Sequence, residues 1–290
     1  MTPLRQKMID AMLMRGFAER TQHSYLAAVI QLSKYYNRSP EHLTTAQLQA
    51  YFLHLVKEKQ LAPATCRLYF NAICFLYVQV LGWSDLSLDI TLPKRKQRIP
   101  ELLTHDEVAR LLVAVENTKH QVMLTTCYGC GLRLSELTAL RVRDIDGERS
   151  LLRVTQGKGG KDRQVILSTT LLHLLRRYWR IFRPHEWLFY SCRPNSKISD
   201  STPQKIFEAA KKRAGINKIG GIHSLRHAYA THQLAAGMPL PQLQLMLGHN
   251  DLHSTMRYLH WIPQYHEGQG MDLVAGLEIN LEHVREVDDE

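Results

Sequence analysis

Six side chains between positions 133 and 258 have the types that chemistry on a phosphodiester requires. They occur in the order Arg133, Lys158, His223, Arg226, His249 and Tyr258. Arginine presents a planar fork of donors to phosphate oxygens, and histidine and lysine exchange protons. Tyrosine becomes a nucleophile when its hydroxyl, with a pKa of about 10, loses its proton. Singly, each residue also has an ordinary explanation as a surface charge, a helix cap or a half-buried ring.

The spacing of these residues carries more information than their types. His223 and Arg226 are three residues apart, which places both on one face of a helix and lets both contact one phosphate. Lys158 lies in a basic, glycine-rich stretch, 156–163, and Tyr258 follows His249 by nine residues. The pattern therefore predicts one site assembled from several separate segments.

Together and in this order, the motifs resemble the active site of tyrosine site-specific recombinases, the family of phage integrases, Xer proteins and integron integrases. The flanking segments 135–137 and 255–260 are also similar to the family pattern. Segments 21–25 and 64–73 resemble the helical core-binding domain of Xer-like members, so the resemblance covers nearly the whole chain. The sequence departs from close Xer relatives at 261–265 and in its longer, acidic end. The biological role stays open among chromosome dimer resolution, mobile-element integration and cassette exchange.

The resemblance implies a covalent mechanism in which Tyr258 forms a 3′-phosphotyrosine and releases a 5′ hydroxyl. It implies His223 as the general base, His249 as a donor to a phosphate oxygen and Lys158 as the acid that protonates the leaving 5′ oxygen. The two arginines would stabilise the charge of the transition state. No cofactor, metal or ATP is expected, because the arginines supply the charge that a magnesium ion would otherwise supply. The implied partners are double-stranded DNA and further copies of the chain in a tetrameric synapse.

Two short patterns allow a metal or redox site. His223 and His227 have a zinc-ligand spacing, but the residues between them are Ser-Leu-Arg, and an arginine there repels a cation. Cys127 and Cys130 form one CxxC with no second pair, which favours half-buried thiols over metal or redox chemistry. We expect no metal site.

Two other functions would use part of the same pattern. Segment 231–247 looks like a helix-turn-helix and would suit a DNA-binding regulator without enzymatic activity, in which Lys158 has no role. A relaxing topoisomerase would use the same tyrosine without sequence specificity or synapsis. A covalent DNA adduct separates the enzymes from the regulator, and recombinant product separates the recombinase from the topoisomerase.

The composition is typical of a globular protein that binds a polyanion. The 290 residues carry a formal net charge of +10. Segment 271–290 contains seven acidic residues against one arginine, so the rest of the chain is more basic still. Such a charge attracts nucleic acid. The five cysteines lack a framework spacing, and neither a signal peptide nor a membrane span is indicated. We therefore expect a cytoplasmic protein with free thiols and no membrane partner.

Helical periodicity dominates the elements that must position the six residues. Apolar spacings of three and four predict helices over 26–36, 48–55, 68–80, 169–182, 203–214, 224–236 and 240–247. Thr104 and Glu107 form a capping box that opens another helix. Segments 151–155 and 164–167 alternate and predict a β-hairpin. The expected fold is mainly α, with a helical N-terminal domain and a mostly helical catalytic domain that contains a small antiparallel β-sheet.

The predicted domains are a helical, SAM-like DNA-binding domain at 1–92, a linker at 93–100, a catalytic domain at 101–270 and an acidic tail at 271–290. In the linker, prolines at both ends disfavour a helix. Its basic side chains are predicted to bind DNA as a strap across the phosphate backbone: Lys94, Arg95, Lys96 and Arg98. In the tail, Val274, Leu277, Leu281 and Val284 have helical spacing, which predicts docking on a neighbouring protomer.

Overall fold

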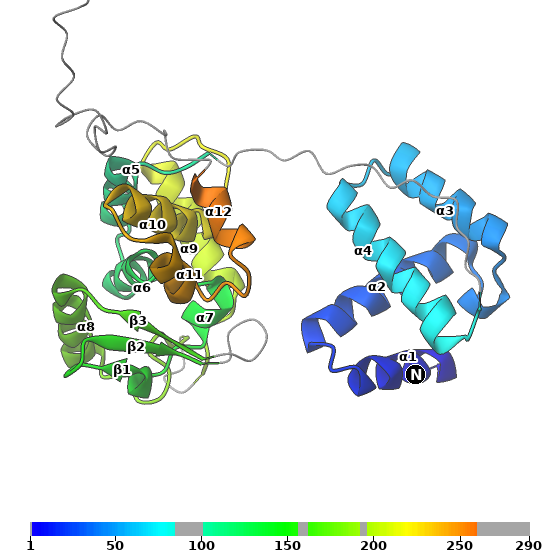
Figure 1. Cartoon of the computed structure of the whole chain (residues 1–290), viewed down its shortest axis with the longest axis horizontal. Helices are drawn as coiled ribbons and strands as arrows, with labels where there is room; N and C mark the ends of the chain where they lie inside the picture. The colour runs from blue at the N-terminus through cyan, green and yellow to red at the C-terminus, as the bar shows by residue number, and fades with distance from the viewer. Residues whose placement is uncertain (1, 85–100, 156–161, 192–195, 260–290) are drawn as a thin grey trace, which may run out of the picture. The chain divides into compact units, whose positions relative to one another are not determined.

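The computed structural model describes residues 2–84, 101–155, 162–191 and 196–259. The chain divides into two compact units, Met1–Arg98 and Ile99–Glu290 (Figure 1). The predicted linker at 93–100 and tail at 271–290 lie outside the described residues, so the predicted domain limits remain predictions. Within the described ranges, no helix combines the length and the apolar character that a membrane span needs.

The first unit is helical, as the apolar spacing predicted. Its elements are α1 (Pro3–Met14), α2 (Glu19–Tyr36), η1 (Pro40–His42), α3 (Thr45–Lys57), α4 (Pro63–Cys74) and the π-helix η2 (Phe75–Val80). Thr44 caps α3 in a capping box with Gln47, which explains why this helix begins there. The buried side chains form one apolar core that includes Leu32, Leu48 and Tyr77.

The second unit contains the small sheet and the remaining helices. Its elements are α5 (His105–Val113), α6 (Thr118–Gly129), α7 (Leu134–Thr138), η3 (Val142–Asp144), β1 (Ile145–Asp146), β2 (Leu151–Val154), β3 (Arg163–Ile166), α8 (Thr169–Phe182), α9 (Ser201–Arg213), α10 (His223–Ala235), α11 (Leu240–Leu247) and α12 (His253–Leu259). The predicted capping box is confirmed: Thr104 caps α5 and Glu107 accepts a hydrogen bond from its backbone N–H. The mainly helical fold class is confirmed as well.

The predicted hairpin is confirmed as β2 and β3, which pair antiparallel with Leu152 opposite Val165. Both of those side chains are buried, so the apolar residues of the alternating pattern that predicted the strands face the core. The strand β1 extends the sheet in the order β1-β2-β3. It was not predicted, because its two residues are too few to show a period of two. In Figure 1 the helix α8 lies alongside this sheet.

Four helices of the second unit position the candidate site. The helix α10 buries Leu225 and Ala228 in the main core with side chains of α6, which fixes the helix that carries His223 and Arg226. The helix α11 packs against both α10 and β3, and α12 packs against α10 and α11. The helices α7 and α12 were not predicted, since five and seven residues are too short to establish a helical period.

Candidate active site

The structure gathers four of the six predicted residues at one place. Arg133 is the N-cap of α7 and Arg226 lies in the first turns of α10. His249 follows the end of α11, and Tyr258 lies in α12. His223 is the first residue of α10, one turn before Arg226. Lys158 and the four linker residues Lys94, Arg95, Lys96 and Arg98 lie outside the described residues, so their predicted roles remain predictions.

The guanidinium of Arg226 is almost fully buried, with 1% of the residue exposed. Its Nη1 donates to the carbonyl of Gly131 at 2.7 Å, and its Nη2 donates to the carbonyl of Leu247 at 2.6 Å. Burial, followed by the positive charge of Arg133, lowers the pKa of Arg226 to about 10, so it stays charged at neutral pH. An arginine buried beside another arginine is unfavourable unless an anion compensates the charge.

The side chain of Arg133 is anchored at two points. Its Nη1 donates to Oε1 of Glu136 at 2.7 Å, and its Nη2 donates to the carbonyl of Gly248 at 3.1 Å. Its own backbone N–H donates to Oε2 of the same glutamate at 2.8 Å. About a fifth of the side chain, 20%, is exposed, so Arg133 remains accessible to a ligand while its orientation is fixed. We refer to Arg133 and Arg226 as the arginine pair.

Two glycines supply carbonyls to the arginine pair, and both need left-handed backbone. Gly131 has φ of +57° and accepts from Arg226, whereas Gly248 has φ of +63° and accepts from Arg133. A Cβ on Gly131 would overlap the ring of Tyr229. Glycine is the residue that adopts this backbone without strain, and here it also allows the close packing.

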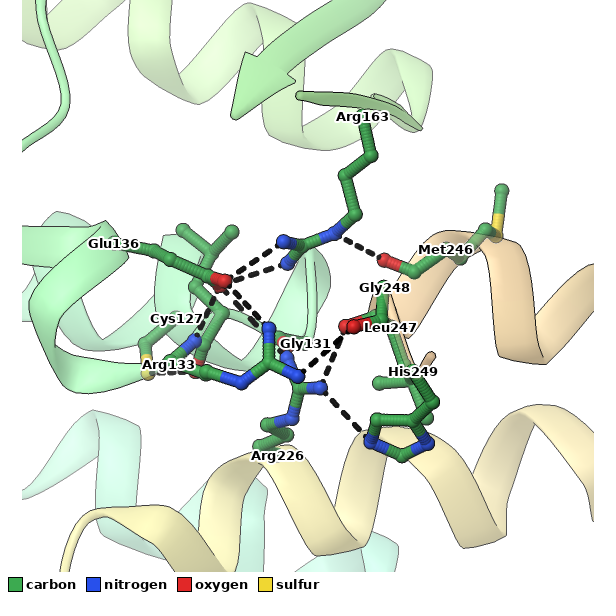
Figure 2. A network of polar contacts seen from close by, with 11 residues as sticks. Cys127, Gly131, Arg133, Glu136, Arg163, Arg226, Met246, Leu247, Gly248 and His249 are labelled. Carbon is green, nitrogen blue, oxygen red and sulfur yellow. Dashed lines mark hydrogen bonds and ion pairs between the residues drawn. The ribbon is translucent and has the colours of Figure 1, made fainter. Parts of the chain in front are cut away.

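A third arginine, Arg163 at the start of β3, completes the network (Figure 2). Its Nη1 and Nη2 donate to the two carboxylate oxygens of Glu136, each at 2.7 Å. Burial alone would raise the pKa of Glu136, but the hydrogen bonds and charge of Arg163, together with the hydrogen bonds of Arg133, lower it to about 2. Glu136 is therefore an anion at any physiological pH, surrounded by three guanidinium groups (Figure 2).

The hydrogen bonds of His249 fix its tautomer. A guanidinium only donates, so Nε2 of His249 accepts from Nη2 of Arg226 at 3.1 Å. The ring proton is then on Nδ1, which donates to Oγ1 of Thr255 at 2.8 Å. Burial, followed by the charges of Arg226 and Arg133, lowers the pKa of His249 to about 4. His249 is thus uncharged at neutral pH.

Tyr258 is a buried tyrosine whose hydroxyl faces a histidine. Only 4% of the residue is exposed, and its oxygen lies 3.2 Å from Nδ1 of His227. Its ring is parallel to that of His249, with centroids 6.2 Å apart. Burial raises the pKa of Tyr258, and the nearby charges of Arg226 and Arg257 oppose this rise. The hydroxyl is therefore protonated at neutral pH, and its use as a nucleophile requires a base.

Two of the histidines of α10, His223 and His227, lie next to each other. Their rings are 4.7 Å apart and nearly perpendicular, with His223 exposed and His227 partly buried. Burial, then the charges of His223 and Arg226, lowers the pKa of His227 to about 4. Partial desolvation of the ring, which remains accessible to solvent, and then the charges of the arginine pair also lower the pKa of His223. Both histidines are able to accept a proton at neutral pH.

The cysteines of the CxxC are more deeply buried than predicted. Cys127 and Cys130 are 1% and 0% exposed, and both are free thiols. Burial raises the pKa of each thiol to about 12, so neither is a thiolate at neutral pH. Across the described ranges, no three His, Cys, Asp or Glu side chains are grouped as metal ligands would be.

Comparison with known proteins places this geometry in a family. Residues 101–264 match the model of the phage integrase family, and residues 4–85 match that of the phage integrase N-terminal SAM-like domain. The chain belongs to the phage integrase family. The resemblance to tyrosine recombinases inferred from the motifs is thereby confirmed.

Relatives of this integrase cover most of its length. A putative integrase/recombinase of Sinorhizobium fredii, y4qK, is 41% identical over 261 residues, which are 89% of this chain and 84% of the relative. Tyrosine recombinase XerD of Oceanobacillus iheyensis is 32% identical over 268 residues, 85% and 89% of the two chains. The crystal structure of XerH recombinase bound to palindromic difH substrate, a post-cleavage complex, is 21% identical. It shares the fold, with a TM-score of 0.69 over 86% of this integrase and 79% of that chain.

Sequence reasoning missed three residues of this integrase's polar network. Glu136 was noted only as a neighbour of Arg133, Arg163 only as the last residue of the hairpin turn, and His227 only as a possible zinc ligand. No sequence pattern indicated Glu136, because a capping box begins with serine or threonine and the N-cap here is Arg133, although Glu136 does accept from its backbone N–H. The partners of Arg163 and His227 are 27 and 31 residues away in sequence, which no local pattern reveals.

Proposed function

We propose that this integrase is a site-specific tyrosine recombinase that cleaves and rejoins double-stranded DNA through a 3′-phosphotyrosine on Tyr258. The observation that carries the proposal is the convergence of the arginine pair, His249 and Tyr258 from four separate helices or helix ends onto one site. This convergence joins a nucleophile to fixed positive charge that an anion must balance.

The chemical step exchanges one phosphate ester for another. The Tyr258 oxygen attacks the phosphorus, the bond from phosphorus to the 5′ oxygen breaks, and the DNA 3′ end is left on the tyrosine. The negative charge of the pentacoordinate transition state spreads over the non-bridging oxygens, to which each guanidinium of the arginine pair can present two donors. Attack by a 5′ hydroxyl on the phosphotyrosine reverses the step, so the ester energy is conserved and neither ATP nor a metal is required.

Each proton has a proposed destination. His223 accepts the proton of Tyr258 as general base, and His227 orients the tyrosine hydroxyl through the 3.2 Å hydrogen bond. Lys158 protonates the departing 5′ oxygen. A phosphate oxygen that accepts from Arg226 would replace Nε2 of His249, and the phosphate charge raises the pKa of this histidine. His249 would then take up a proton and donate to the phosphate.

The proposed partner is duplex DNA bound by the SAM-like unit, the linker 93–100 and the catalytic unit. Replacing the four basic linker residues by glutamine should reduce the salt dependence of binding, with the log–log slope changing by about 0.9 for each lost phosphate contact. The proposed assembly is a tetramer on two duplexes, to which the tail 271–290 contributes by docking on a neighbour. Truncation after Gly270 should weaken synapsis and leave single-site binding intact; unchanged recombination would argue against docking.

The decisive experiment recovers covalent protein–DNA complexes from cells that express the chain. Denaturing washes remove bound but unlinked protein, sequencing of the retained DNA gives the target site, and peptide mapping gives the linked residue. We expect an adduct on Tyr258 and none from Tyr258→Phe, which should still bind the site. Absence of an adduct from the wild-type chain, on cellular DNA and on nicked suicide duplexes, overturns the proposal and favours a DNA-binding regulator. Supercoil relaxation without recombinant product would instead indicate a topoisomerase.

A further inference from the structure

Arg163 makes three hydrogen bonds that join distant parts of the catalytic unit. Two go to the carboxylate of Glu136, and the third runs from Nε to the carbonyl of Met246 at 2.7 Å. Its side chain is 9% exposed, so it is not an ordinary surface charge. Figure 2 shows it reaching from β3 to the glutamate on one side and to the end of α11 on the other.

The bonds to Glu136 act on Arg133. The two oxygens that accept from Arg163 are the same two that accept from the backbone N–H and Nη1 of Arg133. A planar guanidinium bound to both oxygens fixes the plane of the carboxylate, and the carboxylate plane fixes Arg133. Without Arg163, rotation of the Glu136 carboxylate would move the Arg133 guanidinium with it.

The bond to Met246 acts on the other half of the site. The next carbonyl, that of Leu247, accepts from Arg226, and the following one, that of Gly248, accepts from Arg133. Gly248 also packs against Arg163 so closely that a Cβ there would lie 2.9 Å from its Cδ. The end of α11, which supports both members of the arginine pair, thus rests on Arg163.

The charge of Arg163 argues against a purely structural role. It adds a third positive charge around a single carboxylate, and its proximity is one of the causes that lower the pKa of Arg226. An excess of positive charge at a buried site is compensated when a phosphate enters.

We propose that Arg163 is a positioning residue of the recombinase site, which orients Glu136 and the end of α11 so that Arg133 and Arg226 meet the same scissile phosphate. The inference rests on the proposed function. It adds a residue that acts through Glu136 and the end of α11 and not by contact with the nucleophile or the phosphate. Arg163 also lies five residues after Lys158. Through its bonds to Glu136 and Met246, Arg163 therefore connects the strand β3, which follows Lys158 in sequence, to the arginine pair.

The test is single-turnover cleavage of a nicked suicide duplex built on the DNA sequence recovered from the wild-type adduct, at saturating protein. Two versions are compared: one with the natural scissile phosphate, and one with a scissile methylphosphonate, in which a neutral methyl group replaces one non-bridging oxygen. We expect Arg163→Gln to cleave the phosphate about 10²-fold more slowly than wild type, because misplacement of a positioned group has this scale of effect. On the methylphosphonate the ratio should shrink toward one, because less charge remains for the arginine pair to stabilise.

A conservative variant and a matched control complete the design. Arg163→Lys keeps the charge but loses the planar fork, so it should recover only part of the phosphate rate. Arg153→Gln removes an exposed arginine from the adjacent strand β2 and should cleave like wild type. Circular dichroism and thermal unfolding check that both Arg163 variants fold; if Arg163→Gln does not, the comparison of the two substrates is made with Arg163→Lys.

Three outcomes overturn the inference while leaving the proposed function intact: wild-type rates for Arg163→Gln, full recovery by Arg163→Lys, or an equal defect on phosphate and methylphosphonate in a folded variant. Failure of the proposed function gives a different result, since the wild-type chain itself would then form no adduct on the phosphate duplex.

Discussion

The two compact units of the molecule bury different kinds of side chain. In the described part of the first unit, the buried residues are apolar or aromatic, and most of them form one cluster. In the second unit, the buried residues also include polar and charged ones: Thr126, Glu136, Thr138, Asp144, Arg226, Thr231 and Thr255. Burial of charge is costly, so an apolar interior is sufficient for folding and a charged one needs a further reason. The difference indicates that the second unit keeps charge in its interior for the proposed chemistry, whereas burial of apolar side chains is sufficient to fold the first unit.

Two buried tyrosines test this comparison most strongly. Tyr77 in the first unit is 0% exposed and donates to the carbonyl of Pro40 at 2.6 Å, whereas Tyr258 faces His227. We expect Tyr258→Phe to abolish adduct formation completely and Tyr77→Phe to leave cleavage at wild-type level. Tyr77→Phe should lower the free energy of unfolding by about 1 kcal/mol, because it leaves a buried carbonyl unpaired. Adduct assays and denaturant unfolding of both variants check this. A covalent DNA adduct from Tyr258→Phe would show that another residue is the nucleophile.

The next largest effect is expected at the buried arginine. Arg226→Gln should slow single-turnover cleavage by about 10²–10³-fold, because it removes one of two donors to the transition-state charge. The matched control is Arg110→Gln on α5, which also removes an arginine that donates to a carbonyl, but at an exposed position. Similar rates for the two variants would mean that burial of Arg226 serves the fold alone.

His223 and His227 of α10 should differ in their effect on cleavage. His223→Gln removes the proposed general base and should slow cleavage by about 10²-fold. His227→Gln retains a polar side chain next to Tyr258 and should slow it by about tenfold, within the range for a misaligned nucleophile. Single-turnover rates across pH 5 to 9 check the assignment. A larger loss of cleavage rate in His227→Gln than in His223→Gln would identify His227 as the general base.

The charged interior should make the second unit sensitive to acid. The pKa of Glu136 is lowered from 4.5 to about 2, so the folded state binds its proton less readily than the unfolded state. Its contribution to stability is therefore complete above pH 4.5 and is lost as pH falls toward 2, by about 3 kcal/mol in all. Urea unfolding at pH 4.5, 3.5 and 2.5 should show this loss in the second unit and less of it in the first.

Glu136→Gln provides the control for this acid sensitivity. The variant should be less stable than wild type at pH 5, and the difference should shrink as pH falls. His227 and His249, whose pKa values are lowered to about 4, also reduce stability as pH falls from 6.5 to 4, because the unfolded state takes up their protons first. This contribution is present in both proteins and cancels in the comparison. A constant difference across pH would show that Glu136 is not the source.

The smallest effect is expected from a single methyl group. Gly248→Ala should slow cleavage by about tenfold, because the added Cβ lies within 2.9 Å of Arg163 and displaces the carbonyl that anchors Arg133. Gly215→Ala is the matched control, since Gly215 has a similar φ of +67° and open space around its Cβ position. Both variants should lose about 1 kcal/mol of stability from the left-handed backbone. Thermal unfolding and cleavage rates separate the shared strain from the local contact.

Local sequence patterns predicted most of the secondary structure, for physical reasons that particular elements illustrate. The helix α8 and the helix α11 begin and end at the predicted residues, since each has an apolar face of clear helical period and a well-defined N-terminal turn. The capping residues Thr44 and Thr104 set helix starts through contacts only three residues long. Among the elements that were missed, β1, α7 and α12 are too short to show any period and form because the surrounding unit packs around them. The helix α1 was predicted only as part of a helical first unit, without bounds.

The sequence by itself determined the family to which this protein belongs. The types and order of six residues were sufficient to infer it: Arg133, Lys158, His223, Arg226, His249 and Tyr258. Only the tertiary structure decided how those residues are held and in what state. The burial of Arg226, the tautomer of His249 and the partnership of Arg163 with Glu136 all depend on groups that are distant in sequence. Hydrogen-bond direction and desolvation depend on which groups the tertiary structure packs together, so no local sequence pattern predicts them.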